Sequence, residues 1–72
     1  MDAGERLWRV RKESRSLEAV LRADPNTQHV ELQFFYQGVL LVGRRFPTRA
    51  LAEESAAGKL TELQIRGWAT HW

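Results

Sequence analysis

Hydrophobic residues are concentrated in two neighbouring stretches, His29–Tyr36 and Val39–Phe46. β-branched and aromatic residues, which are enriched in β-strands, are frequent in both. Gln37 and Gly38 separate them, and glycine readily takes the positive φ that a tight hairpin turn requires. The pattern therefore predicts a β-hairpin.

Two registers fit this hairpin. A two-residue loop places Phe35 opposite Leu40, so that Val30, Leu32, Phe34 and Tyr36 share a face with Val39, Leu41, Gly43 and Arg45. A three-residue loop with a bulge at Gly38 shifts the second strand by one residue, and the apolar face then contains Val30, Leu32, Phe34, Leu40, Val42, Arg44 and Phe46. We favour the second register because it adds Phe46 to the apolar face.

The chain before the hairpin predicts further strands. Residues 1–6 are polar and are expected to be frayed, whereas alternation begins at Leu7 and continues to Lys12. Residues 17–23 alternate in part and are predicted as a strand, with a two-turn helix as the alternative. Residues 24–27 contain Asp, Pro and Asn and predict a turn.

A helical period follows the hairpin, over residues 49–66. Thr48 is a suitable N-cap, and Gly67 suits the left-handed position after a helix. The face expected to pack on the sheet contains Ala52, Ala56, Leu60 and Leu63. We expect Trp68 to cover the core at the start of an aromatic tail, residues 67–72. The prediction is one α+β domain over residues 1–72, with a three- or four-stranded antiparallel meander and one C-terminal helix packed on one face.

Length and composition limit the functional classes. The chain has 72 residues, of which 43% are hydrophobic and 28% charged, and it contains no cysteine. These values are ordinary for a soluble domain, and the lack of cysteine excludes disulfides and thiolate metal sites. Neither a signal peptide nor an apolar run long enough to cross a bilayer is recognised, so we expect a cytoplasmic protein without a membrane partner.

Candidate catalytic residues are sparse. His29 and His71 are the two histidines, and neither has the neighbouring His or Glu spacing of a metal or acid–base site. A domain of this size can hardly enclose a substrate pocket. We therefore expect no enzyme, no metal and no cofactor.

Basic residues suggest one candidate binding site. The net charge is only +2, but arginines flank the expected helix start and the first strand. Free N–H groups at a helix N-terminus and forked guanidinium groups together bind anions such as phosphate. The candidate anion or nucleic-acid site contains Arg9, Arg11, Lys12, Arg44, Arg45 and Arg49, with Phe35 or Tyr36 as stacking platforms. In the alternative interpretation, Arg44 pairs with an acid such as Glu31 and the other cations are solvated.

A second candidate surface lies on the helix. Leu51, Gly58 and Ile65 are spaced by seven residues on the side away from the main apolar face. A glycine within a helix costs about 1 kcal/mol relative to alanine, and close approach of a second helix would explain it. The candidate interaction residues are these three and Trp72. In the alternative interpretation, Leu51 and Ile65 flank the core and Gly58 is a tolerated defect.

Residues Leu40–Arg49, Ala52–Glu54 and Arg66–Trp68 resemble a group of small bacterial proteins. Those proteins share a strand pair, a Thr-Arg helix start, an alanine-spaced helix and a terminal Gly-Trp, and the resemblance brings no activity with it. Residues 42–57 also resemble the sheet-plus-helix DNA-binding domains of plant Apetala-type regulators and of tyrosine-recombinase arm-binding domains. That resemblance implies DNA reading by Arg9, Arg11, Arg44 and Arg45, although the Gly-Val-Arg start and the Trp-Val strand motif are missing.

We therefore expect a small non-enzymatic interaction module whose partner is a second copy of itself or another protein. The alternative is a nucleic-acid-binding domain that uses the sheet arginines and the helix N-terminus.

Overall fold

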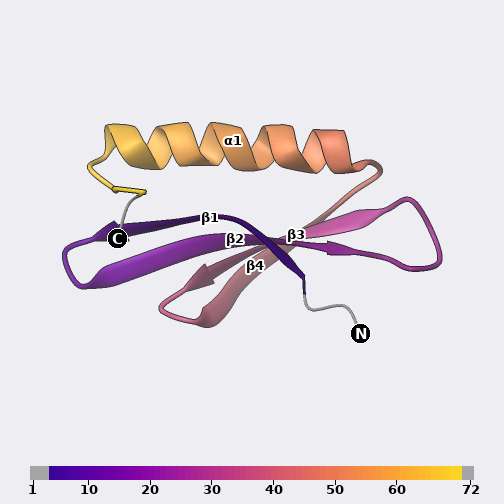
Figure 1. The fold of residues 1–72 in the computed structure, drawn as a ribbon, viewed down its shortest axis with the longest axis horizontal. Helices are drawn as coiled ribbons and strands as arrows, with labels where there is room; N and C mark the ends of the chain where they lie inside the picture. The colour runs from indigo at the N-terminus through magenta and orange to yellow at the C-terminus, as the bar shows by residue number, and fades with distance from the viewer. Residues whose placement is uncertain (1–3, 71–72) are drawn as a thin grey trace.

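The computed structural model describes residues 4–70, which form an antiparallel sheet covered on one face by a helix (Figure 1). The strands are β1 (Glu5–Lys12), β2 (Arg15–Ala23), β3 (Val30–Tyr36) and β4 (Val39–Phe46), and the helix is α1 (Arg49–Ile65). Neighbours in sequence are neighbours in the sheet, whose order is β1-β2-β3-β4. The predicted α+β meander with a C-terminal helix is confirmed, with four strands among the described residues.

The turns between strands follow from local chemistry. Gln37 and Gly38 have φ of 54° and 82°, as a two-residue hairpin loop with positive φ at both positions requires. In the β2–β3 turn, the carboxylate of Asp24 accepts a hydrogen bond of 2.9 Å from the backbone N–H of Asn26. Residues 17–23 lie within β2, so the strand prediction is confirmed and the alternative of a short helix is wrong.

The β3–β4 register combines parts of both predicted alternatives. Tyr36 pairs with Val39 and Phe35 with Leu40, as a two-residue loop requires, but Phe34 pairs with Val42. A bulge therefore lies at Leu41 and not at Gly38. The favoured apolar face is correct from Val42 to Phe46, whereas Leu40 lies on the opposite face, with Phe35.

A second bulge lies in β1, between Arg6 and Trp8. Leu7 is the extra residue, and both Leu7 and Trp8 pack against the core. β1 begins at Glu5, so the expectation of a frayed terminus is wrong for residues 5 and 6. Pairing of Glu5 with Leu21 and of Arg6 with Val20 explains the earlier start.

The helix ends are capped as predicted. The Thr48 hydroxyl accepts a hydrogen bond of 3.3 Å from the N–H of Leu51. At the other end, Gly67 has φ of 97°, and the N–H of Trp68 donates to the carbonyl of Leu63 over 3.0 Å. This is a Schellman motif, which stops the helix before the chain turns back toward β1.

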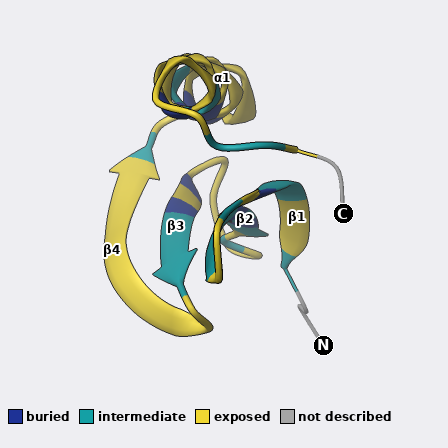
Figure 2. Cartoon of the chain, turned by 90° about the vertical axis from the view of Figure 1, so that its left-hand side faces the viewer, coloured by how far each residue is buried: buried dark blue, intermediate teal, exposed yellow. Residues whose placement is uncertain are grey.

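The core lies between α1 and the sheet (Figure 2). Ala52 and Ala56 are fully buried against β2 and β3 side chains, and Leu63 is also buried, whereas Leu60 is only half-buried. The buried hydrophobic residues are Val10, Ala19, Leu21, Val30, Leu32, Ala52, Ala56 and Leu63. Small alanines let the helix approach closely, so one thin apolar layer joins helix and sheet.

Candidate interaction surface

Strand β4, at the edge of the sheet, is exposed along most of its length (Figure 2). Four of its exposed residues are aliphatic and consecutive in sequence. The exposed fractions are 65% for Val39, 50% for Leu40, 60% for Leu41 and 47% for Val42. Single exposed aliphatic residues are normal on a soluble protein, but contiguous apolar patches are associated with binding sites. β4 also contains no charged residue before Arg44.

A groove runs between β4 and α1. Its volume is about 570 Å³. The walls and floor comprise Trp8, Leu17, Phe34, Leu41, Val42, Arg44, Ser55, Gly58, Lys59, Glu62 and Leu63. Leu41 and Val42 both line it because the bulge brings consecutive side chains of β4 to the helix side. Apart from Arg44, the strand side of the lining is apolar, and Lys59 and Glu62 place charges along the helix side.

Gly58 forms part of the helix wall of this groove. A Cβ atom placed on Gly58 would meet no other atom within 4 Å. The glycine is therefore not required for close packing within residues 4–70, and its effect is to widen the groove.

The other predicted interaction residues have different positions. Leu51 is 46% exposed and Ile65 is 81% exposed, so both are available to a partner. They do not line the groove, which Gly58 does. Trp72 lies outside the described residues. The exposed part of β4 was not predicted from the sequence, because the favoured register placed Leu40 and Val42 on the apolar face.

The opposite edge of the sheet is partly covered. Ala69 forms an isolated antiparallel bridge with Arg11 of β1. The N–H of Arg11 donates to the carbonyl of Ala69 over 2.8 Å, and the N–H of Ala69 donates to the carbonyl of Arg11 over 2.9 Å. Between residues 4 and 70, β4 is therefore the more open edge.

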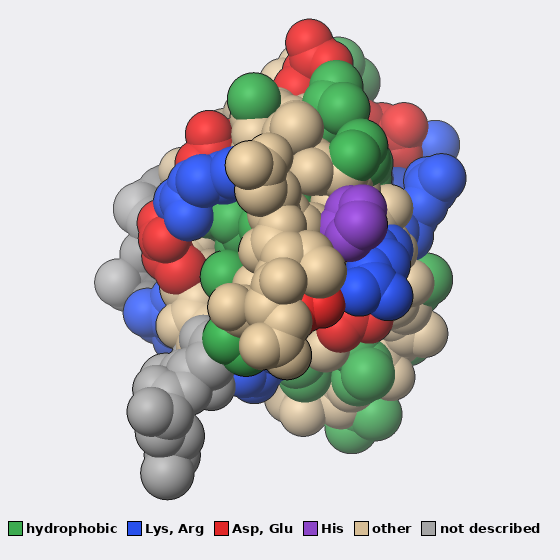
Figure 3. Space-filling view, turned by 90° about the vertical axis from the view of Figure 1, so that its right-hand side faces the viewer, with side chains coloured by type: hydrophobic (Ala, Val, Ile, Leu, Met, Phe, Trp, Pro, Cys, Tyr) green, Lys and Arg blue, Asp and Glu red, His purple; other side chains and the backbone are tan. Residues whose placement is uncertain are grey.

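The predicted basic site is not assembled as a single patch. Arg9 and Arg11 extend from the sheet face away from α1, whereas Arg44 lies in the groove on the helix side. The ammonium group of Lys12 donates a hydrogen bond of 2.8 Å to the carbonyl of Arg66, at the end of the helix. Positive and negative side chains are interspersed around the histidine at the β2–β3 end of the molecule (Figure 3).

Acidic partners neutralise two of the predicted cations. Arg49 donates hydrogen bonds of 2.8 Å to both carboxylate oxygens of Glu5 and one of 2.7 Å to Glu53. The bonds to Glu5 raise the pKa of Arg49 most, and those to Glu53 raise it further. Arg45 donates over 3.0 Å to Asp24. The helix N-terminus therefore presents carboxylates beside its arginine, which disfavours an anion there.

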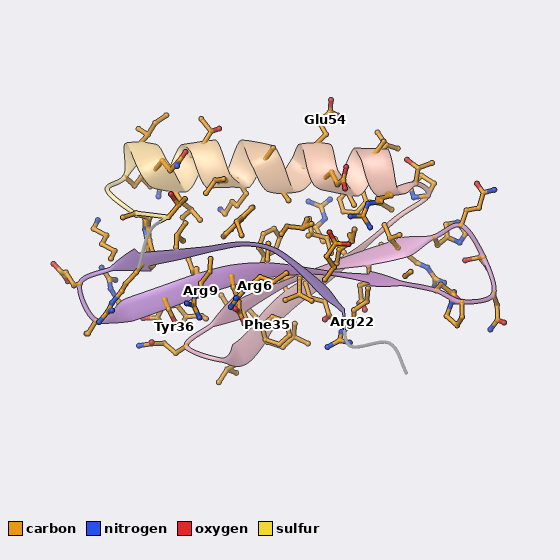
Figure 4. The ribbon with its side chains drawn as sticks, viewed as in Figure 1. Arg6, Arg9, Arg22, Phe35, Tyr36 and Glu54 are labelled. Atoms are coloured by element: carbon orange, nitrogen blue, oxygen red, sulfur yellow. The ribbon has the colours of Figure 1, made fainter. Side chains whose placement is uncertain are left out.

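The sheet face away from α1 brings the predicted Arg9 together with Arg6 and Arg22, which were not part of the predicted basic site. Arg6, Arg9, Arg22 and Phe35 lie on this outer face (Figure 4). Strict alternation would place Arg6 and Arg9 on opposite faces, but the bulge at Leu7 brings them to the same face. Arg6 approaches Glu18 to 3.4 Å, and Arg22 donates over 2.8 Å to the side chain of Gln33.

Residues 4–70 provide no group of three His, Asp or Glu side chains placed to hold a metal ion. His29 lies beside a smaller hollow of about 260 Å³ at the β2–β3 end, together with the Asp24–Arg45 pair. Hydrogen bonding by the N–H of Asn26 lowers the pKa of Asp24, and Arg45 lowers it further. Over the same range, no helix has the length and apolar character to span a membrane.

Comparison of the chain with protein-family models, with curated proteins and with solved structures found no match in any of the three. The resemblances noted in the sequence therefore stay predictions.

Proposed function

We propose that this chain is a non-enzymatic interaction module that binds a polypeptide along β4 and in the groove between β4 and α1. The observation that carries the proposal is the exposure of four consecutive aliphatic residues, Val39 to Val42, on an open strand edge, with Leu41 and Val42 lining the groove and Leu40 on the opposite face. An open edge offers backbone N–H and C=O groups to an added strand, while neighbouring side-chain sites select what binds.

Side chains that line the groove would determine which polypeptide segments bind. Leu41, Val42 and Phe34 offer an apolar floor, and Arg44 lies at the same wall. Arg44 forms no ion pair with any residue between 4 and 70. A bound segment with apolar side chains pointing into the groove would cover surface that water now contacts, which favours association.

Site-specific photocrosslinking tests this proposal in cells that produce the protein. A photoreactive amino acid at Leu41 should give discrete crosslinked products, because this side chain lies in the groove. The same probe at Glu54 is the matched control, since Glu54 points away from the sheet (Figure 4). Equal products from both positions, or none from Leu41, would contradict a binding surface at β4.

A nucleic-acid-binding domain is the second candidate function. The observation that favours it is the uncovered outer face, where Arg6, Arg9 and Arg22 lie with Phe35 (Figure 4). Arginines contact phosphates, and an aromatic ring can stack on an unpaired base. Against it, Arg6 and Arg45 already pair with carboxylates.

Titration with mixed-sequence DNA and RNA at about 50 mM salt separates the two candidates, because phosphate contacts weaken steeply as salt increases. If the second candidate holds, Arg9→Gln weakens binding and Arg66→Gln, which removes one charge at the helix end, changes it less. No binding at micromolar protein would remove this candidate and leave the first untouched.

A further inference from the structure

We infer that the polypeptide bound along β4 is a strand of another protein, with an acidic and an apolar side chain two residues apart that face Arg44 and Val42. This inference rests on the proposed function, because it names the chemistry of the occupant of the same surface. The argument comes from the part of β4 beyond its bulge, where the pairing with β3 is regular.

The first step is that residues 42–46 form a regular edge. They pair one by one with residues 30–34 of β3, so the bulge at Leu41 lies outside this stretch. In an edge strand, every second residue directs its N–H and C=O groups away from the neighbouring strand. An added strand can therefore pair with residues 42–46 without a change in their backbone.

The second step is that this edge presents different side chains on its two faces. Val42 and Arg44 lie on the helix side, where both line the groove. Gly43 and Arg45 lie on the other side, because successive residues of a strand point to opposite faces. Residues directly opposite one another in paired strands have neighbouring side chains. The residues that face Val42 and Arg44 are therefore two positions apart in the added strand.

The third step identifies the acidic residue. Arg44 is exposed and forms no ion pair within residues 4–70, and opposite charges across two strands are stabilising. A second copy of this chain is poorly suited to supply the carboxylate. Its β4 contains no Asp or Glu, and the acid of its other edge strand, Glu5 of β1, is already bonded to Arg49. Charge complementarity therefore favours a different polypeptide.

The fourth step identifies the apolar residue. Val42 is 47% exposed and lines the groove together with Leu41 and Phe34. An apolar side chain that faces Val42 would lie beside this apolar surface and remove part of it from water, which favours association. A β-branched or aromatic side chain suits the position best, because such residues also favour the extended conformation of a strand.

The fifth step excludes a uniformly acidic segment. On the face away from α1, the Glu31 carboxylate lies over Gly43, where a Cβ atom would come within 2.6 Å of Glu31 Oε2. The residue between the acidic and the apolar one would lie opposite Gly43, close to this carboxylate, so an acid there would be repelled. The edge therefore favours an acid on the helix side and disfavours one on the other side.

Selection from a random heptapeptide library displayed on phage tests the inference. With the wild-type chain, we expect enriched peptides that carry an acidic and an apolar residue two positions apart, with no acid between them. Either order of the two residues supports the inference, because the order reports only the direction of the added strand. Arg44→Glu should shift the enrichment to Lys or Arg at the acidic position, since the facing charge is reversed.

Fluorescence anisotropy of a selected peptide measures the contribution of the ion pair. Arg44→Gln should weaken binding by about two- to fivefold, as expected for an exposed pair of opposite charges. Arg44→Glu should weaken it further, and replacing the acid of the peptide by Lys should restore binding to this variant. Arg45→Gln is the matched control, because it removes the same charge from the other face of the same strand, where Arg45 already pairs with Asp24. Circular dichroism checks that each variant folds.

Three results would overturn the inference. The first is the absence of enriched peptides, or enrichment of peptides that lack the acid. The second is selection of the same acidic peptides by the wild type and by Arg44→Glu. The third is equal weakening of peptide binding by Arg44→Gln and Arg45→Gln, which would indicate a general effect of charge and not a contact with Arg44.

Failure of this inference is distinguishable from failure of the proposed function. A chain that crosslinks from Leu41 to another protein but enriches no acid-containing peptide would overturn the inference and retain the interaction module. Crosslinked products that contain only this chain would make the occupant a second copy, which also overturns the inference alone. No crosslink from Leu41 and no enriched peptide would overturn both.

Discussion

The indole N–H of Trp8 donates a hydrogen bond of 2.9 Å to the main-chain carbonyl of Ala56. Trp8 lies at the bulge of β1, and Ala56 lies in the middle of the buried face of α1. The Trp8 ring also packs against Phe34 of β3, with ring centroids 5.9 Å apart. One side chain therefore fixes the helix along its axis relative to two strands.

Trp8→Phe tests this contact. Phenylalanine keeps an aromatic ring near Phe34 but has no N–H to donate to Ala56, so we expect the free energy of unfolding to fall by about 1–2 kcal/mol. Urea denaturation followed by circular dichroism measures the change. Trp68→Phe is the control, since the Trp68 ring faces the guanidinium of Arg15 at 5.6 Å, near the surface. An equal loss in both variants would contradict a specific role for the Trp8 hydrogen bond.

Gly58→Ala should stabilise the chain. The added Cβ meets nothing within 4 Å, and alanine is favoured over glycine within a helix by about 1 kcal/mol. Gly38→Ala is the matched comparison: it also has free space, but its φ of 82° disfavours any side chain, so it should destabilise. Thermal unfolding compares the two. Destabilisation by Gly58→Ala would indicate that the helix position is under a constraint outside residues 4–70.

Thr48→Ala should destabilise the chain by about 1 kcal/mol, because the hydroxyl caps the N–H of Leu51. Thr61→Ala removes the same group at a different place. The Thr61 hydroxyl donates to the carbonyl of Ala57 within the helix, where alanine is intrinsically favoured, so a small gain or no change is expected. Chemical denaturation of both variants separates capping from a general effect of losing a hydroxyl.

The sequence predicted the features of the fold that depend on neighbouring residues. Alternation, the Gln37-Gly38 turn, the Thr48 cap and the Gly67 end each follow from a few adjacent residues, and the structure contains all of them. The two bulges could not be predicted from neighbouring residues, because each depends on how its strand pairs with the adjacent strand. At Leu41 and at Leu7, one additional residue changes the face of every side chain beyond it.

The exposure of β4 has a geometric cause that the sequence pattern did not contain. A helix is about 10 Å wide, and adjacent strands are about 4.8 Å apart, so a single helix covers roughly two strands. The buried core residues of the sheet come from β1, β2 and β3, and β4 contributes none of them. On the helix side of the sheet, Val39, Leu41 and Val42 are therefore in the part that α1 is too narrow to cover, whereas Leu40 is exposed on the opposite face.

The predicted basic site failed to assemble for a related reason. Residues adjacent in sequence, such as Arg44 and Arg45, point to opposite faces of a strand. The acidic partners of the cations are distant in sequence and could not be identified from neighbouring residues. Arg49, for example, donates a hydrogen bond to Glu5, which is 44 residues earlier in the chain. Sequence alone identified the cations, but the pairing that neutralises them arises from tertiary contacts.

The dependence of stability on pH provides the last prediction. Asp24 accepts hydrogen bonds from the N–H of Asn26 and from Arg45, and both favour the charged carboxylate. Its pKa in the folded chain is therefore lowered from the ordinary value of about 3.9. Because the folded pKa is lowered, the charged Asp24 carboxylate contributes fully to the free energy of unfolding above about pH 4. This contribution is lost as the pH falls through the folded pKa.

We expect the free energy of unfolding to fall below about pH 4 in the wild type and to fall less in Asp24→Asn. Asparagine can still accept from the Asn26 N–H, so this substitution removes the titrating charge while keeping the turn. The two stabilities should converge as the pH decreases. Glu54→Gln is the control, because Glu54 forms no ion pair within residues 4–70, and its profile should follow the wild type. Parallel profiles for wild type and Asp24→Asn, measured by urea denaturation from pH 7 to about pH 3, would show that the Asp24–Arg45 pair does not stabilise the β2–β3 end of the sheet.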